Sequence, residues 1–151
     1  MRRKRDSGAE GGGGAAWRRA LEAWLPVLLL ECLVLYLSTR PGLHLPGRFP
    51  HLDKLAHFSE YALSGWLLFR ALNRSGVRRL TGWLGAVAAV AALSAGDEWL
   101  QSHVPGRDSS PIDWLADLLG GMIGATLGGW WFGRAGRRGR GRPVLARETE
   151  G

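Results

Sequence analysis

Residues 97–117 read DEWLQSHVPGRDSSPIDWLAD, and this stretch decides the fold because it sets a dense polar cluster between two apolar runs. The runs, at residues 80–100 and 111–132, are each roughly long enough to cross a bilayer as a helix. Ionisable groups at the mouth of a membrane bundle cost free energy unless they pair, reach water or face a cavity. The stretch therefore predicts two membrane helices joined by a polar turn that holds a candidate site.

Two more apolar segments precede this pair, so the chain is predicted to be an all-α integral membrane protein with four transmembrane helices. The helices are expected at residues 19–38, 53–72, 80–101 and 111–132, within one membrane domain of residues 17–133. Ser110, followed by Pro111 and then by Asp113, is typical of a helix start. Residues 1–16 and 134–151 are rich in glycine and arginine and are predicted to be disordered basic tails.

The first predicted helix contains two residues that are unusual inside a span. Pro26 predicts a kink, because proline removes a backbone donor from the helix interior. Glu31 falls near the middle of the membrane, where a carboxyl group needs a proton or a polar partner. We consider two interpretations of Glu31: a hydrogen bond to another helix, and a role in proton- or ion-coupled transport.

The net charge of +7 is distributed as a membrane topology requires. Of the 20 Lys and Arg residues, all but four lie in or next to the tails or around the connection at residues 73–79, and the exceptions are Arg40, Arg48, Lys54 and Arg107. The positive-inside rule then predicts that both termini are cytoplasmic. This pattern favours contact of the tails with anionic membrane lipid and argues against a nucleic-acid partner. The single cysteine, Cys32, cannot form an internal disulfide.

This topology brings polar residues that are far apart in the sequence to one level of the membrane. Asp53, His57 and Tyr61 follow one another at four-residue spacing and share a helix face. The start of the second helix, the end of the third and the start of the fourth all lie at the outer surface. The residues expected at this level are Asp53, Lys54, His57, Glu60, Tyr61, Asp97, Glu98, Gln101, His103, Arg107, Asp113 and Asp117.

The order and spacing of these residues resemble the VanZ-like family of small bacterial membrane proteins. The matching motifs are D-K-x-x-H-F-x-x-Y at residues 53–61, D-E-x-x-Q at 97–101, P-G-R-x-x-S at 105–110 and D-x-x-x-[ND]-x-x-G at 113–120. Asp117 stands where the family often has asparagine, which adds a negative charge. The family name comes from a member associated with resistance to the glycopeptide antibiotic teicoplanin. The resemblance therefore implies a protein of the bacterial cytoplasmic membrane with a role in the cell envelope.

Three interpretations of the polar cluster are open. The first is a network of salt bridges and hydrogen bonds that locks the helices together. The second is a divalent cation such as Mg²⁺ or Mn²⁺, with the possible ligands Asp53, His57, Glu98 and Asp113. The third is a site for a small molecule or a lipid headgroup, in which the planar guanidinium of Arg107 binds a phosphate or carboxylate.

For the third interpretation we assign candidate roles. The candidate catalytic residues are His57, Glu98, Asp97 and Asp113, and the candidate substrate-binding residues are Arg107, Lys54, Gln101, Tyr61 and Asp117. The expected ligand is a cell-envelope amphiphile, such as a lipid-linked precursor or a glycopeptide-type compound. The alternatives are a structural or assembly protein without enzymatic activity and a small ion-coupled transporter. The stripe formed by Gly120, Gly124 and Gly128 allows a close helix contact, which predicts a possible oligomer.

Overall fold

The computed structural model describes residues 10–41, 52–107 and 110–140, with side chains described over 13–41, 54–107 and 110–134. Over the described residues the fold is all-α, as predicted, with α1 at Glu10–Ser38, α2 at Leu52–Arg74, α3 at Arg79–Gln101 and α4 at Pro111–Arg140. Helices α2 and α3 lie within two residues of their predicted bounds, whereas α1 begins much earlier, at Glu10, and α4 continues further, to Arg140. Parts of the expected tails are therefore helical, since adding a residue to an existing helix costs little. Residues 1–9 and 141–151 lie outside the described part.

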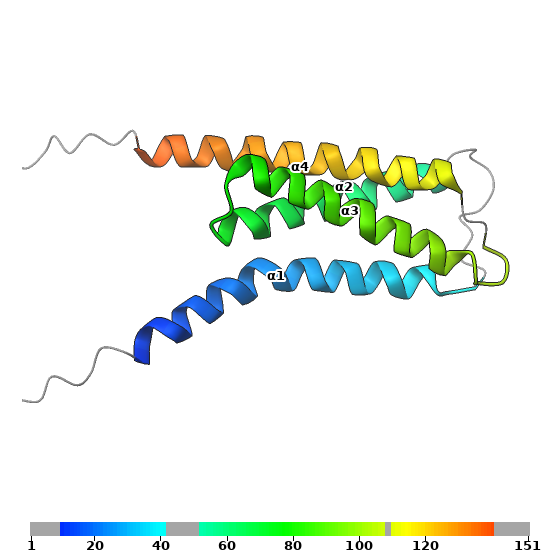
Figure 1. Cartoon of the computed structure of the whole chain (residues 1–151), viewed down its shortest axis with the longest axis horizontal. Coiled ribbons are helices and arrows are strands. Elements are labelled where there is room, and N and C mark those ends of the chain that lie inside the picture. The colour runs from blue at the N-terminus through cyan, green and yellow to red at the C-terminus, as the bar shows by residue number, and fades with distance from the viewer. Residues whose placement is uncertain (1–9, 42–51, 108–109, 141–151) are drawn as a thin grey trace, which may run out of the picture.

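The four helices run alternately up and down along one long axis (Figure 1). Helices α2, α3 and α4 pack on one another, whereas α1 contacts α2 and α3 but not α4. One end of the molecule, here called the polar end, holds the end of α1, the start of α2, the end of α3 and the start of α4. The motif-bearing segments thus meet at one level, as the alternating topology predicts.

Helix α1 bends in its first half (Figure 1), and it contains Pro26 within the helix. A bend is thus present in the helix that contains Pro26, and proline favours bending because it removes a backbone donor. The bend turns the first part of α1 away from the other helices. Among the described residues α1 has no contact with α4, so less of its surface is covered by the other helices.

The glycine stripe of α4 packs against α2 of the same chain. A side chain at Gly120 would collide with the carbonyl group of Phe58, and one at Gly124 would collide with the backbone of Ala62. Gly128 packs against aromatic side chains of α2. The small-residue stripe therefore brings two helix backbones together. Within the chain this face of α4 packs on α2, and an oligomer through the same residues stays a prediction.

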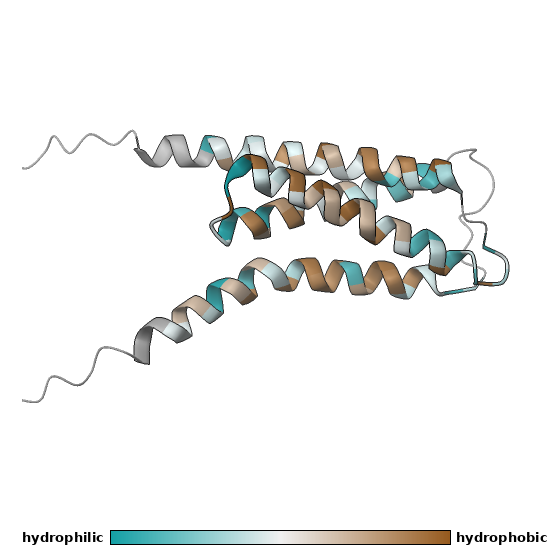
Figure 2. Ribbon diagram, viewed as in Figure 1, coloured by the Kyte–Doolittle hydropathy of each residue, from teal (hydrophilic) through white to brown (hydrophobic). Residues whose placement is uncertain are grey.

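Two of the described helices, Gly13–Ser38 of α1 and Arg79–Gln101 of α3, are long and apolar enough to cross a membrane. Figure 2 shows hydrophobic residues along the middle of α1 and α3 and hydrophilic residues gathered near the helix ends. Helices α2 and α4 do not reach the same hydropathy, because they carry inward-facing acidic and histidine side chains and, in α4, an arginine-rich end. We predicted four membrane-spanning helices, and two of the described helices meet the requirements of length and apolar composition.

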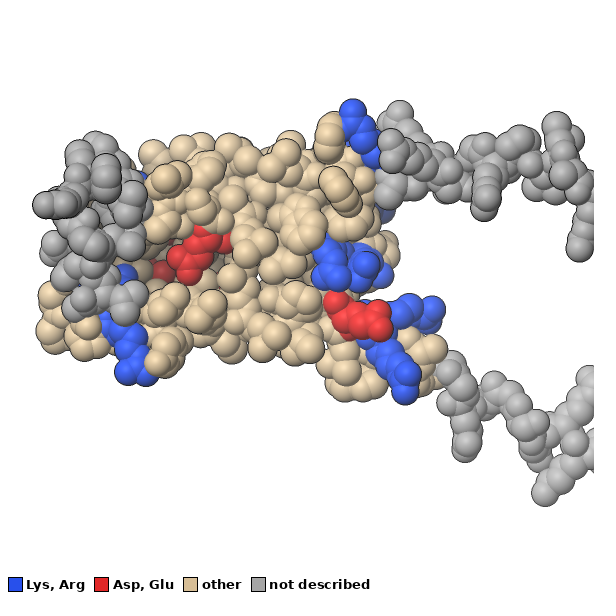
Figure 3. All heavy atoms as spheres, turned by 180° about the vertical axis from the view of Figure 1, so that it is seen from behind, with Lys and Arg blue, Asp and Glu red and all other residues tan. Residues whose placement is uncertain are grey.

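The distribution of polar side chains is the reverse of that in a water-soluble bundle. Four polar residues near the polar end, Asp97, Gln101, Asp113 and Asp117, are buried. Large apolar side chains are exposed on every helix, among them Leu28, Leu29, Leu55, Leu84, Trp99, Leu119, Ile123 and Leu127. Figure 3 shows the consequence: a broad surface that is largely uncharged apart from acidic atoms in one hollow, with Lys and Arg side chains towards its two ends. Such a surface suits a hydrocarbon environment.

Candidate functional site at the polar end

Helices α2 and α4 are joined by two polar pairs that lie about one helical turn apart. The Lys54 Nζ donates to Asp113 Oδ1 at 2.6 Å, and His57 Nδ1 lies 3.2 Å from Asp117 Oδ1. The two helices run in the same direction from the polar end, so residues about one turn apart on α2 meet residues one turn apart on α4. Asp117 is fully buried, with 0% of its surface exposed. These pairs match the register in which α2 and α4 pack.

Helix α3 contributes a third carboxylate and connects it to the start of α4. The backbone N–H of Ser110 donates to Glu98 Oε2 at 2.9 Å. The Ser110 hydroxyl in turn accepts from the N–H of Ile112, which makes Ser110 the helix cap that its position predicted. Glu98 Oε1 is buried and has no hydrogen-bond partner among the described residues.

Also on α3, Asp97 and Gln101 form a buried pair on either side of Glu98 in the sequence. Gln101 Nε2 donates to Asp97 Oδ2 at 3.0 Å, an interaction between residues one helical turn apart. The same amide lies 3.5 Å from the hydroxyl of Ser38 at the end of α1. The predicted substrate-binding residue Gln101 is therefore engaged in holding α1 and α3 together.

The side chain of Arg107 closes the end of α1. Its Nη2 donates at 2.8 Å to the carbonyl oxygen of Leu37 near the end of α1, which also accepts from the backbone N–H of Arg40. Its Nε is buried and unpartnered among the described residues. Arg107 reaches this position from a turn in which Gly106 has a φ of 78°, a conformation that favours glycine. Arg107 thus joins the turn before α4 to α1, and its Nε–H group is available to donate a further hydrogen bond.

A second polar group lies deeper in the bundle, between α1 and α2. The Ser64 hydroxyl donates to the carboxyl group of Glu31, so the expected hydrogen bond from Glu31 to another helix is confirmed. Ser64 follows His57 by two turns on the same face of α2, a spacing that could have identified it as the partner. Tyr61 is buried between these two levels. Figure 3 shows acidic atoms in a hollow of the apolar surface, in the half of the molecule nearer the polar end.

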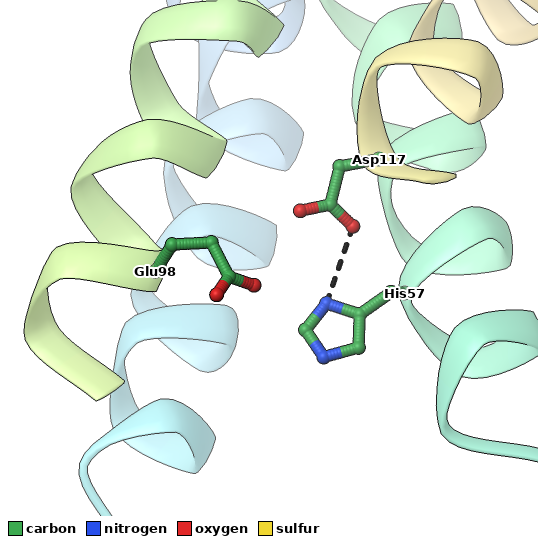
Figure 4. A group of neighbouring side chains, drawn as sticks. All are labelled: His57, Glu98 and Asp117. Carbon is green, nitrogen blue, oxygen red and sulfur yellow. Dashed lines mark hydrogen bonds and ion pairs between the residues drawn. The ribbon is translucent and has the colours of Figure 1, made fainter. Parts of the chain in front are cut away.

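Three helices place His57, Glu98 and Asp117 around one point (Figure 4). One possible ligand atom from each residue lies within 4.8 Å of the others. The Asp117 carboxylate bonds His57 with one oxygen, and Figure 4 shows the other oxygen on the side that faces Glu98. That second oxygen, Asp117 Oδ2, is buried without a hydrogen-bond partner. We call these three residues the His57–Glu98–Asp117 cluster.

Other predicted site residues lie elsewhere. Asp113 belongs to the ion pair with Lys54 and is not in the three-residue cluster, where the sequence placed it as a possible metal ligand. Asp117, predicted as a substrate-binding residue, takes that position. His103 is exposed and contacts Ser102 and the carbonyl of Trp99. The side chain of Asp53 lies outside the described residues.

A comparison with protein families identifies the chain. The model of the VanZ/LLP1 family matches residues 17–132, which is most of the chain and includes every motif that forms the polar end. The chain belongs to the VanZ/LLP1 family. No match is found among curated proteins or solved structures. Family membership and the two apolar helices of this VanZ/LLP1 protein identify a membrane protein.

The geometry of the polar end shows which chemical groups the VanZ/LLP1 motifs bring together. They supply carboxylate oxygens that accept hydrogen bonds, a histidine that can carry a proton between two carboxylates, and an arginine with an unused donor. Such a set can hold a cation, bind hydroxyl or ammonium groups of a ligand, or join helices. The family assignment by itself does not select one of these roles.

Proposed function

We propose that this VanZ/LLP1 protein spans the bacterial cytoplasmic membrane with all four helices and places its polar end at the outer surface. There it binds or processes a cell-envelope amphiphile, such as a lipid-linked precursor or a glycopeptide-type compound. The observation that carries the proposal is the burial of acceptor and donor groups inside a bundle whose outer surface is apolar. An amphiphile presents the same two chemistries, a polar headgroup for the interior and apolar chains for the outer faces.

The exposed residues of α4 support its role as a membrane span despite its low average hydropathy. Leu115, Leu119, Ile123 and Leu127 are all exposed and recur every four residues, so they form one apolar face. The opposite face holds the small residues and carboxylates that pack on α2. The mean hydropathy of the whole helix combines these two faces. It is therefore lower than the hydropathy of the face that contacts lipid.

The distribution of basic residues supports the proposed orientation. The start of α1, the α2–α3 connection and the end of α4 lie at the end of the molecule opposite the polar end. The described arginines there include Arg18, Arg19, Arg74, Arg78 and Arg134, whereas the polar end has Arg40, Lys54 and Arg107. The positive-inside rule favours a cytoplasmic location for the more basic end.

Direct binding in lipid nanodiscs tests the proposal. Native mass spectrometry of the purified protein with a polyprenyl-linked saccharide or a lipoglycopeptide should detect a complex. Arg107→Ala, His57→Ala and Glu98→Gln should each weaken it by about tenfold or more, since each removes a charge-assisted hydrogen bond. Arg40→Ala is the matched control, because Arg40 lies near the same end but is exposed and bonds Tyr36. Equal affinity in all four variants would refute the proposal.

A second candidate function is structural, and the observation that supports it is the pairing of polar side chains between helices. Lys54–Asp113, His57–Asp117 and Ser64–Glu31 each join two different helices. If the polar layer serves only to specify helix packing, the same variants should lower the unfolding temperature in detergent and change no ligand binding. Measuring the unfolding temperature and the binding affinity on each variant separates the two functions.

A further inference from the structure

We propose that the His57–Glu98–Asp117 cluster binds one divalent transition-metal ion, with Mn²⁺ or Zn²⁺ favoured over Mg²⁺. The site is built from three helices, with His57 on α2, Glu98 on α3 and Asp117 on α4 (Figure 4). This inference does not depend on the identity of any amphiphile, because the ion binds to the protein alone.

The spacing of the ligand atoms is the first argument. Ions of this class bind nitrogen and oxygen at about 2.1 Å, so two ligands of one ion lie at most about 4.2 Å apart. The three ligand atoms lie within 4.8 Å of one another. A side-chain movement of less than about 1 Å therefore closes the cluster around an ion. Since the histidine and both carboxylates end in rotatable bonds, this movement requires no change in the helices.

Unsatisfied oxygens give the second, independent argument. Asp117 is 0% exposed, yet its Oδ2 has no hydrogen-bond partner among the described residues. Glu98 Oε1 is also buried and unpartnered. A buried carboxylate oxygen without a partner costs free energy, because it has lost its bonds to water. A cation between Glu98 and Asp117 satisfies both oxygens at once.

The charge balance points in the same direction. Glu98 and Asp117 bring two negative charges, whereas the cluster offers at most one positive charge, on His57. Lys54 is paired with Asp113 at 2.6 Å. Two carboxylates in a buried site repel each other, and a divalent ion replaces this repulsion by attraction to both. The imidazole can then act as a neutral third ligand.

The ligand types select among metals. Carboxylate oxygens suit Mg²⁺ and Mn²⁺, whereas imidazole nitrogen suits Zn²⁺ and other later transition metals. A set of one imidazole and two carboxylates fits ions that accept both kinds of ligand. Mg²⁺ is disfavoured, because it prefers oxygen ligands and gives up its water reluctantly.

Metal binding to the full-length protein in detergent provides the test. After treatment with a chelator and removal of the chelator, titration with Mn²⁺, Zn²⁺ and Mg²⁺ is followed by calorimetry. The expected result is one site per chain for Mn²⁺ or Zn²⁺, with at least about tenfold weaker binding of Mg²⁺. The unfolding temperature should rise with the concentration of the bound ion, since the folded state alone presents the site.

Variants then assign the ligands. Asp117→Asn and Glu98→Gln keep the shape of each side chain and should each weaken binding by at least about tenfold. Glu22→Gln is the control, because Glu22 is an exposed carboxylate in the first half of α1, away from the polar end. It should retain the affinity of the unaltered protein within about twofold. The unfolding temperature of each metal-free variant shows whether it is folded.

Electron spin echo spectroscopy of bound Mn²⁺ gives a readout that a merely structural role would not change. The spectrum should contain a coupling to one imidazole nitrogen, and His57→Ala should remove this coupling. Three results would overturn the inference. These are no stoichiometric binding of any of the three ions, a spectrum without nitrogen coupling, and binding by Asp117→Asn as tight as that of Glu22→Gln.

Discussion

At the scale of single residues, the polar end depends on whether each buried charge has a partner. The Lys54 side chain is 30% exposed and the Asp113 side chain 10%, so their ion pair is partly screened by its surroundings. The His57–Asp117 pair is more deeply buried, with 15% and 0% exposed. Removing one partner of a buried pair lowers the free energy of unfolding by more than the intact pair adds to it. The reason is that the remaining charge is left buried without a partner.

The Lys54–Asp113 pair leads to the first prediction. In a double-mutant cycle with Lys54→Met and Asp113→Asn, the coupling free energy should be about 1 kcal/mol, because the pair is short but incompletely buried. Each single variant should lower the unfolding free energy, and the double variant should lose less than the sum of the two. Reversible unfolding in mixed micelles measures this quantity. Strictly additive losses would show that the two charges do not interact in the protein.

At the scale of elements, the contact between α2 and α4 decides which residues meet. Gly120 and Gly124 lie against backbone atoms of α2, so no side chain can be accommodated at either position without separating the helices. Gly65 of α2 makes the same kind of contact with Gly121 of α4. The polar pairs at the start of these helices depend on this close approach, since a wider spacing would move the carboxylates away from Lys54 and His57.

The glycine contact leads to the second prediction. Gly124→Ala should lower the unfolding free energy by about 2 kcal/mol or more, because the new methyl group collides with the Ala62 backbone, which cannot move alone. Thermal unfolding in detergent measures the effect. The matched control is Gly96→Ala in α3, where no atom lies within 4 Å of the added carbon. There the change should stabilise the protein by about 0.5–1 kcal/mol through helix propensity. Similar effects at both positions would contradict the packing argument.

At the scale of the whole molecule, the apolar surface and the two charged ends define how the protein sits in a membrane. The proposed orientation places the polar end outside and the more basic end inside. Two helices meet the requirements for a span by composition alone. The other two present apolar residues outward and polar residues inward, among them Asp113 and Asp117 of α4.

Cysteine accessibility gives the third prediction, in a Cys32→Ser background because the native cysteine is exposed. In spheroplasts, a membrane-impermeant thiol reagent should label Leu45→Cys and Ser102→Cys at the outer side. It should label Asn73→Cys and Leu145→Cys only after the membrane is opened. Labelling of all four positions on intact spheroplasts, or of one residue from each predicted pair, would exclude the four-span topology.

Much of this architecture could be predicted from local patterns. The four helices and their alternation follow from runs of apolar residues and from breakers such as Pro105 and Gly106. The convergence of residues 53–61, 97–101 and 113–117 at one end follows from that alternation. The early start of α1 and the late end of α4 could not be predicted, because glycine- and arginine-rich segments have no apolar periodicity to define a boundary.

The sequence by itself determined the helices, the family and the end of the bundle at which its polar residues gather, because hydropathy and motif spacing are properties of neighbouring residues. Only the tertiary structure decided that Lys54 takes Asp113 and that His57 takes Asp117. Both aspartates lie on one face of α4, and either could have met either partner. The axial register of α4 on α2, set by glycines packed against a distant backbone, makes that choice.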